Sequence, residues 1–117
     1  LDQFSRNIYR DLPQSFAQDG MALTLSQIAV RDHMIENMTG DQLAFLLMPF
    51  MHSESKKIHE EAVIYFNVTG LEGTLEFEKK HKKIIDKFGR YPHRNHILGR
   101  KSTEEELAFL KLPGSSF

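Results

Sequence analysis

The segment from Leu75 to Phe88 constrains the fold more than any other part of the chain, because its amphipathic pattern is clear. Apolar residues and one histidine recur at spacings of three and four: Phe77, His81, Ile84, Ile85 and Phe88. Lysines fill most of the other positions, and acidic residues stand in the first turn, where a helix dipole favours them. Gly89 follows as a stop signal. The pattern predicts a helix that ends at Gly89 and buries this face, Phe77 included.

Other segments show the same helical spacing and have recognisable ends. We expect four of them: Phe16 to Met38 with Ser15 as its cap, Asp41 onward with a break or kink near Met48 before Pro49, Ser53 to about Gly70, and a short helix capped by Ser102 or Thr103. No segment alternates in the manner of a strand. The expected fold is therefore all-α, with antiparallel helical hairpins in a tetratricopeptide-like array.

Length and composition limit the classes of protein that remain. A chain of 117 residues with 40% apolar residues supports a single helical domain over residues 1–117. The formal net charge is -1, and no apolar run approaches the roughly 20 residues of a membrane span. The absence of cysteine excludes disulfides, thiolate catalysis and Cys-ligated metals. We expect a soluble, cytoplasmic protein that does not interact with membranes.

Charged and polar groups gather in the connector that follows the amphipathic helix. Residues 76–101 carry nine Lys or Arg against three acids. The connector supplies five candidate ligand-binding side chains: Arg90, His93, Arg94, Asn95 and Arg100. Arginine forks and histidines suit a carboxylate or phosphate ligand. The same side chains also suit an internal network that satisfies irregular backbone, with Asp2 and Glu54 as ion-pair partners. Both interpretations remain open from the sequence.

Histidines outside the connector suggest acid–base chemistry. His52, Glu54 and His81 are the candidate catalytic residues, and His81 lies on the apolar face of its helix. A zinc-protease motif fails, because the second histidine that should follow His59 one turn later is Val63. We therefore expect no metal site and no cofactor.

The strings FGRYPHRN at 88–95, LGR at 98–100 and Ser102-Thr103 resemble the signature of the bacterial domain-of-unknown-function 924 family. Weaker matches extend to Leu1-Asp-Gln-Phe4, while the assignment is made on the C-terminal two-thirds of the chain. The resemblance implies an all-α, tetratricopeptide-like fold in a cytoplasmic bacterial protein. Family members usually carry Gln where this chain has His59, so the resemblance implies no shared role for that residue. It also implies further helices upstream of Leu1.

Two hypotheses for function follow. The first is a helical scaffold that binds a protein partner or ligand on a concave face. The alternative is a small enzyme or sensor for an anionic small molecule, with the connector residues holding the anion. Nucleic acid is not an expected partner, because no nucleic-acid-binding signature accompanies the basic segment. If upstream helices are missing, the Phe16 to Met38 helix should expose apolar side chains and promote self-association.

Overall fold

The computed structural model describes the backbone of residues 1–117 and every side chain except that of Asp2. The proposed pairing of Asp2 with arginine therefore lies outside the described residues. The elements in chain order are α1 (Asp2–Ile8), the 3-10 turn η1 (Pro13–Phe16), α2 (Asp19–Arg31), α3 (Gly40–His52), α4 (Lys56–Phe66), α5 (Glu72–Phe88), η2 (Pro92–Arg94), α6 (Asn95–Leu98) and α7 (Glu104–Leu110). The described backbone contains no strand, which confirms the all-α prediction.

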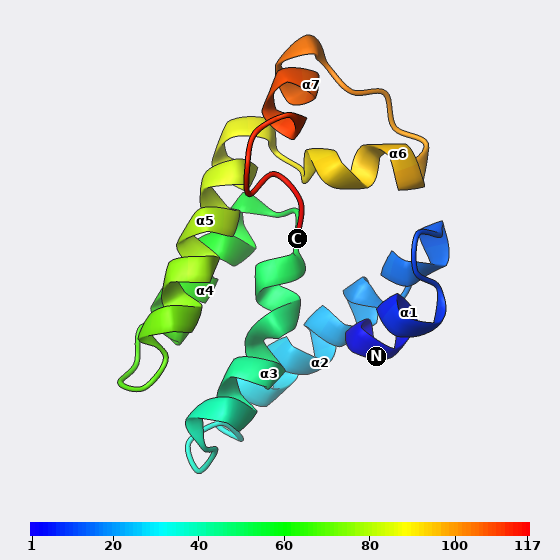
Figure 1. Ribbon diagram of the computed structural model, residues 1–117. Coiled ribbons are helices and arrows are strands. Elements are labelled where there is room, and N and C mark those ends of the chain that lie inside the picture. Colours follow the sequence, from blue (N-terminus) through cyan, green and yellow to red (C-terminus); the bar gives the residue numbers. More distant parts are fainter.

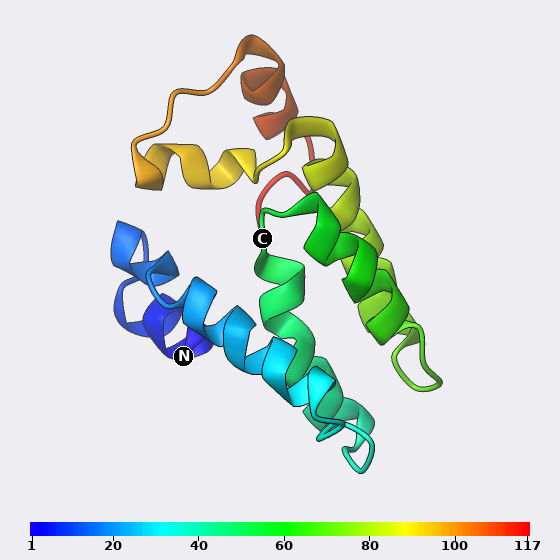
Figure 2. The same cartoon turned by 180° about the vertical axis from the view of Figure 1, so that it is seen from behind.

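Two helical hairpins form the body of the molecule. α2 packs against α3 and α4 packs against α5, while α3 contacts both α4 and α5. Figure 1 and Figure 2 show the loops that close the two hairpins at one end and the η2–α6–α7 segment across the other. α1 and η1 lie beside α2. A space remains between the N-terminal helices, α3, α5 and η2, and this space contains the candidate site.

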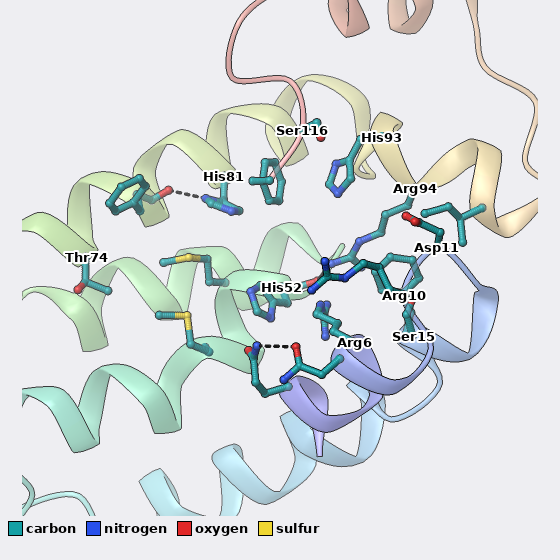
Figure 3. A pocket seen from close by; sticks show the side chains of 18 residues that line it. Arg6, Arg10, Asp11, Ser15, His52, Thr74, His81, His93, Arg94 and Ser116 are labelled. Atoms are coloured by element: carbon teal, nitrogen blue, oxygen red, sulfur yellow. Dashed lines mark hydrogen bonds between the residues drawn. The ribbon is translucent and has the colours of Figure 1, made fainter.

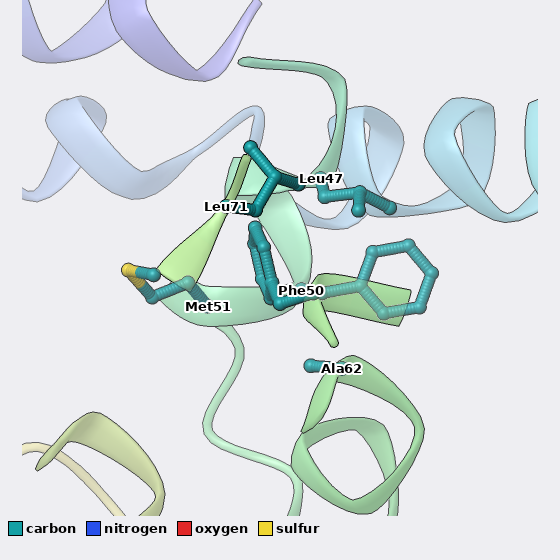
Figure 4. Packing of buried hydrophobic residues seen from close by; sticks show 6 residues of the cluster. Leu47, Phe50, Met51, Ala62 and Leu71 are labelled. Carbon is teal, nitrogen blue, oxygen red and sulfur yellow. The ribbon is translucent and has the colours of Figure 1, made fainter. Parts of the chain in front are cut away.

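The apolar core lies where α3, α4 and the start of α5 meet. Its buried members are Leu47, Phe50, Met51, Ala62, Phe66 and Leu71, which Figure 4 shows in close packing. A second cluster joins Ile84 and Ile85 of α5 to Tyr91, with Phe88 and Phe109 packed beside it. These clusters fix α5 and the start of the connector relative to α3.

The predicted helix from Phe16 to Met38 is wrong at both ends. Its helical part is α2, which ends at Arg31, and Ser15 belongs to η1 rather than capping the helix. The buried positions of α2 are the small residues Ala22, Ser26 and Ala29, whereas Met21 is 58% exposed and Leu25 is 53% exposed. Small side chains allow α2 to approach α3 closely, so the large apolar side chains are left on the outside.

Pro49 does not end its helix, since α3 continues through it to His52. The predicted break near Met48 is therefore not observed. Packing of Phe50 and Met51 in the core compensates for the backbone donor that proline lacks. α4 begins later and ends earlier than predicted, at Lys56 and Phe66.

The other two predicted ends agree with the structure. Gly89 ends α5 in the left-handed conformation with a φ of 73°, which glycine adopts without strain. Thr103 caps α7 in a reciprocal capping box with Glu106.

The buried face of α5 includes His81, Ile84 and Ile85 as predicted, but it differs from the prediction in the first turns of the helix. Phe77 is 59% exposed, whereas Glu78 is fully buried with His81 and Ile85 on the same face. The prediction that Phe77 is buried is therefore wrong. Glu78 points inward because a polar partner, His59 of α4, meets it there.

None of the helices in the described chain is long and apolar enough to cross a bilayer.

Candidate functional site

A cavity of about 890 Å³ opens between the N-terminal helices, α3, α5 and η2. Figure 3 shows Arg6, Arg10 and Arg94 on one side of it, His52 near its centre, and His81 and His93 on the side of α5 and η2. Its polar wall consists mainly of Arg6, Arg10, Asp11, His52, His81, His93 and Arg94. Its apolar wall includes Phe16, Met48, Met51, Phe77, Ile97 and Phe117. The cavity thus combines basic groups, imidazoles and an apolar surface.

Arg94 is the most deeply placed cation of the cavity wall, with 7% of its side chain exposed. Its guanidinium carbon lies 4.6 Å from the ring centroid of Phe16 and 4.8 Å from that of Tyr91. Nη2 donates to the backbone oxygen of His52 at 2.9 Å, and Nε is buried without a hydrogen-bond partner.

The two carboxylates nearest to Arg94 stand too far away for direct hydrogen bonds. Nη1 lies 3.7 Å from Asp19 and 3.8 Å from Glu54. Burial lowers the pKa of Arg94 from its ordinary value, but a guanidinium remains charged at every physiological pH. Arg94 thus has two ion-pair partners and one N–H without an acceptor, and that N–H suits an incoming anion.

Three histidines of the cavity wall are neutral near pH 7. Burial lowers the pKa of His52 to about 3, with further lowering by the charges of Arg6 and Arg94. Burial also lowers the pKa values of His81 and His93 to about 4. Neutral imidazoles cannot act as cationic acids at this pH, but each offers one donor and one acceptor.

The hydrogen-bond partner of His81 determines its tautomer. Its Nδ1 lies 2.6 Å from the backbone oxygen of Phe77, so this nitrogen carries the proton and donates. Nε2 is then left as an acceptor. His93 differs, because its Nδ1 is buried and has no hydrogen-bond partner among the described residues. Two unpartnered nitrogens, His93 Nδ1 and Arg94 Nε, therefore belong to neighbouring residues of η2 that both line the cavity.

The remaining connector candidates lie in an internal network rather than on the cavity wall. Arg100 donates to both carboxylate oxygens of Glu54 at 2.7 and 3.0 Å, and its Nε donates to Asn95 at 2.9 Å. Arg90 binds Glu106 with two hydrogen bonds, of 2.9 and 2.7 Å. Hydrogen bonds from Arg90 lower the pKa of Glu106 to about 2. These side chains hold the connector against α3 and α7.

Glu54 serves as the centre of this network. It accepts a hydrogen bond from the Tyr91 amide at 3.2 Å in addition to those from Arg100. Burial acts to raise its pKa, but the hydrogen bonds from Arg100 and Tyr91 lower it overall. Glu54 is thus an ionised partner of arginine. Of the three candidate catalytic residues, the structure brings His52 and His81 to the cavity and places Glu54 in the network.

A buried polar pair beneath the cavity was missed by sequence reasoning. His59 Nδ1 lies 2.5 Å from Glu78 Oε1, and both side chains are fully buried. His59 Nε2 donates to the backbone oxygen of Ser53 at 2.6 Å. Burial raises the pKa of Glu78, and its second oxygen has no hydrogen-bond partner. Glu78 stands three residues before His81 and seven before Ile85, and this spacing is the sequence signal that places it inside.

Among the described residues, no group of three or more His, Asp or Glu side chains is arranged to hold a metal ion. The arginines and imidazoles that line the cavity are suited to hydrogen bonding and ion pairing. Arginine and neutral imidazole together bind the oxygens of carboxylates and phosphates.

The fold and this site define an all-α protein with a basic, histidine-lined cavity enclosed by helical hairpins. A family model described as "Bacterial protein of unknown function (DUF924)" matches residues 1–114, and the chain belongs to this family. The match extends the resemblance from the C-terminal two-thirds to nearly the whole chain.

A solved structure and the curated proteins give two further comparisons. The protein of unknown function ATU0120 from Agrobacterium tumefaciens is 33% identical and superposes with a TM-score of 0.89. The match covers 95% of this chain and 62% of that protein. The chain thus spans less than two thirds of the length of this relative. A comparison with curated proteins finds no significant match.

Proposed function

We propose that this protein binds a small anionic molecule, with a carboxylate or phosphate group, in the cavity beside Arg94. One observation carries the proposal: the Arg94 guanidinium lies in the cavity wall, nine-tenths buried, with Nε unpartnered and no carboxylate within hydrogen-bond distance. Asp19 and Glu54 supply counter-charge at 3.7 and 3.8 Å, but neither accepts a hydrogen bond from Arg94. A buried N–H without an acceptor is costly, and an oxygen of a bound anion would accept that hydrogen bond.

The neighbouring groups support an anion in preference to a cation. His93 offers its buried ring nitrogen beside Arg94, and Arg6 and Arg10 line the same cavity. Arg6 is held in place by two hydrogen bonds to Asp19, of 2.8 and 3.0 Å. Binding or sensing is favoured over turnover, because Glu54 is ionised and paired while His52 and His81 are neutral.

The proposal is tested by measuring stabilisation of the protein by inorganic phosphate and by acetate. We expect both anions to raise the melting temperature of the wild type. Arg94→Lys should abolish most of this increase, because lysine cannot replace the planar fork. Lys83→Ala, on the exposed face of α5, is the control and should retain it.

Arg94→Lys also lowers the melting temperature without ligand if the internal contacts of Arg94 dominate. A second readout therefore follows the ring signals of His93 by NMR during a phosphate titration of the wild type. Anions that neither stabilise the protein nor shift these signals would refute the proposal.

The scaffold hypothesis, with its tetratricopeptide-like array, is our second candidate, and an apolar surface favours it. Leu1, Phe4, Met21, Leu25 and Phe45 are all at least half exposed on the N-terminal helices and α3. Leu1, Leu25 and Phe45 line one groove with Pro49. An exposed apolar groove of this kind is typical of a protein-binding face.

We propose that a protein partner or a second copy of the chain covers this surface, in a cytoplasmic setting. Light scattering of the wild type and of Phe45→Lys, at an exposed residue of the groove, tests this proposal. Association that the lysine removes would support it, and a wild type that stays monomeric at high concentration would count against self-association.

A further inference from the structure

The ring of Phe117 lies among three other aromatic rings, those of the cavity-lining His81 and His93 and that of the fully buried Tyr91. Its centroid is 4.0 Å from that of His81, 4.4 Å from that of His93 and 5.0 Å from that of Tyr91. The interplanar angles are 61°, 64° and 86°, which are edge-to-face arrangements. Aromatic rings favour these geometries over simple burial against aliphatic groups. Tyr91, His81 and His93 together form a cage for one planar ring.

Two of the three cage residues are fixed independently of Phe117. Tyr91 is fully buried, and its hydroxyl donates to the backbone oxygen of Met51. His81 is held by its bond to Phe77, and Tyr91 also packs edge-on against His59. These two walls of the cage therefore persist when its occupant leaves.

Phe117 itself is weakly held. Residues 111–117 contain no helix, and Phe117 as a whole residue remains 51% exposed. Beyond Leu112, the described residues of this segment make one hydrogen bond, which Ser115 Oγ donates to the backbone oxygen of Leu110. The ring contacts therefore provide most of what keeps Phe117 in the cage, and a competing ring can replace it.

The cage adjoins the anion site. The Arg94 guanidinium carbon lies 4.8 Å from the centroid of Tyr91, and the ring of Phe117 lies 5.0 Å from the same centroid. The two groups are therefore less than 10 Å apart. One small molecule can fill the cage with a ring and reach Arg94 with an acidic group.

We propose that Phe117 is a displaceable occupant of an aromatic subsite, and that the ligand of this cavity is a small aromatic acid. Its ring replaces Phe117 between His81 and His93, and its carboxylate or phosphate binds Arg94. The inference rests on the anion binding proposed above. The ligand binds only those molecules in which the cage is empty. The apparent association constant is therefore the intrinsic constant multiplied by the fraction of such molecules.

Binding of phenyl phosphate, inorganic phosphate and benzyl alcohol to the wild type, Phe117→Ala and Leu112→Ala provides the test. Leu112 belongs to the same segment and is 59% exposed outside the cavity wall, so Leu112→Ala is the matched control. We expect phenyl phosphate to bind the wild type at least tenfold more tightly than phosphate. Phe117→Ala should tighten phenyl phosphate at least fivefold, while phosphate affinity stays within twofold and Leu112→Ala resembles the wild type.

NMR of the wild type gives a second readout that does not depend on any variant. Phenyl phosphate should remove the nuclear Overhauser contacts between the Phe117 and His81 rings, whereas phosphate should leave them intact. Retention of these contacts at saturation would overturn the subsite.

The outcomes separate the two proposals. Phosphate binding that depends on Arg94, with no gain from the phenyl ring in any variant, would overturn the aromatic subsite and leave the anion site standing. Benzyl alcohol that binds Phe117→Ala as tightly as phenyl phosphate would overturn the aromatic acid as ligand. Failure of all three probes would refute the anion site together with the inference that rests on it.

Discussion

α2 and α3 pack against each other, yet they bury opposite kinds of residue. α3 buries Leu47, Phe50 and Met51 in the main core. α2 buries Ala22, Ser26 and Ala29 and leaves its large apolar side chains outside. The hydroxyl of Ser26 donates to the backbone oxygen of Leu46 at 2.7 Å, which brings the two helices close together. Both helices have apolar residues at helical spacing, but only in α3 do these residues form the core.

This difference shows that periodicity identifies a helix without identifying its buried face. A face of small residues buries little apolar area but permits close backbone approach, whereas a face of large residues stabilises by removing more area from water. We therefore expect the N-terminal helices to depend on contacts other than an apolar core of their own. The following predictions test that contrast.

The largest effect should come from truncating the core of α3. Phe50→Ala removes a side chain that is 1% exposed, and it should lower the free energy of unfolding by roughly 3 to 5 kcal/mol. Leu25→Ala, on the exposed face of α2, should change it by less than about 0.5 kcal/mol. Urea titrations of both variants provide the measurement. Equal losses would show that the exposed face of α2 is covered in solution.

Acid should act on the cavity between the N-terminal helices, α3, α5 and η2. The native protein keeps His52, His81 and His93 neutral with pKa values of about 3 to 4, while the unfolded chain binds protons below about pH 6.5. Unfolding therefore takes up protons in this window, and stability should fall as the pH drops from 6.5 to 4. We expect a loss of about 3 kcal/mol for each histidine that stays neutral down to pH 4.

Denaturant titrations at several pH values measure this loss. His81→Asn should reduce the slope, whereas His96→Asn, at an exposed position, serves as the control. A stability that is constant between pH 6.5 and 4 in the wild type would contradict the buried, neutral state of these histidines.

A smaller effect is expected from the connector. Arg100→Lys loses the two-pronged contact with Glu54 and should cost about 1 to 2 kcal/mol. Arg31→Lys provides the comparison, because Arg31 pairs with Asp32 at a site where both side chains are largely exposed. Its effect should be close to zero. Thermal unfolding of both variants at pH 7 distinguishes them, and identical melting temperatures would show that the connector contributes little to stability.

The sequence was sufficient for the fold class and for several helix ends, because those features depend on local signals. Gly89 and Thr103 act within a few residues of themselves, so their roles could be predicted. The orientation of α5 could not, because Glu78 faces inward only through its contact with His59, 19 residues away in the chain. A rule that places charged residues outside fails where a partner is supplied by another helix.

The candidate site was predicted as a cluster of residue types but not as an arrangement. His93 and Arg94 reach the cavity, while Arg90, Asn95 and Arg100 turn to internal partners. All five lie in one short connector. The direction of Arg90 and of Arg100 depends on the positions of their partners Glu106 and Glu54, which belong to other parts of the fold. Pairing of Arg100 with Glu54 joins residues 46 positions apart, which no local pattern specifies.

That separation has a consequence for the order of folding. Contacts between α4 and α5 join neighbouring segments, whereas the Glu54–Arg100 pair closes a loop of 46 residues and forms only after its ends meet. Interactions that form after the transition state change the unfolding rate and leave the folding rate nearly constant. Weakening the Glu54–Arg100 pair should accordingly raise the unfolding rate and shorten the lifetime of the folded protein. The folding rate should stay nearly the same.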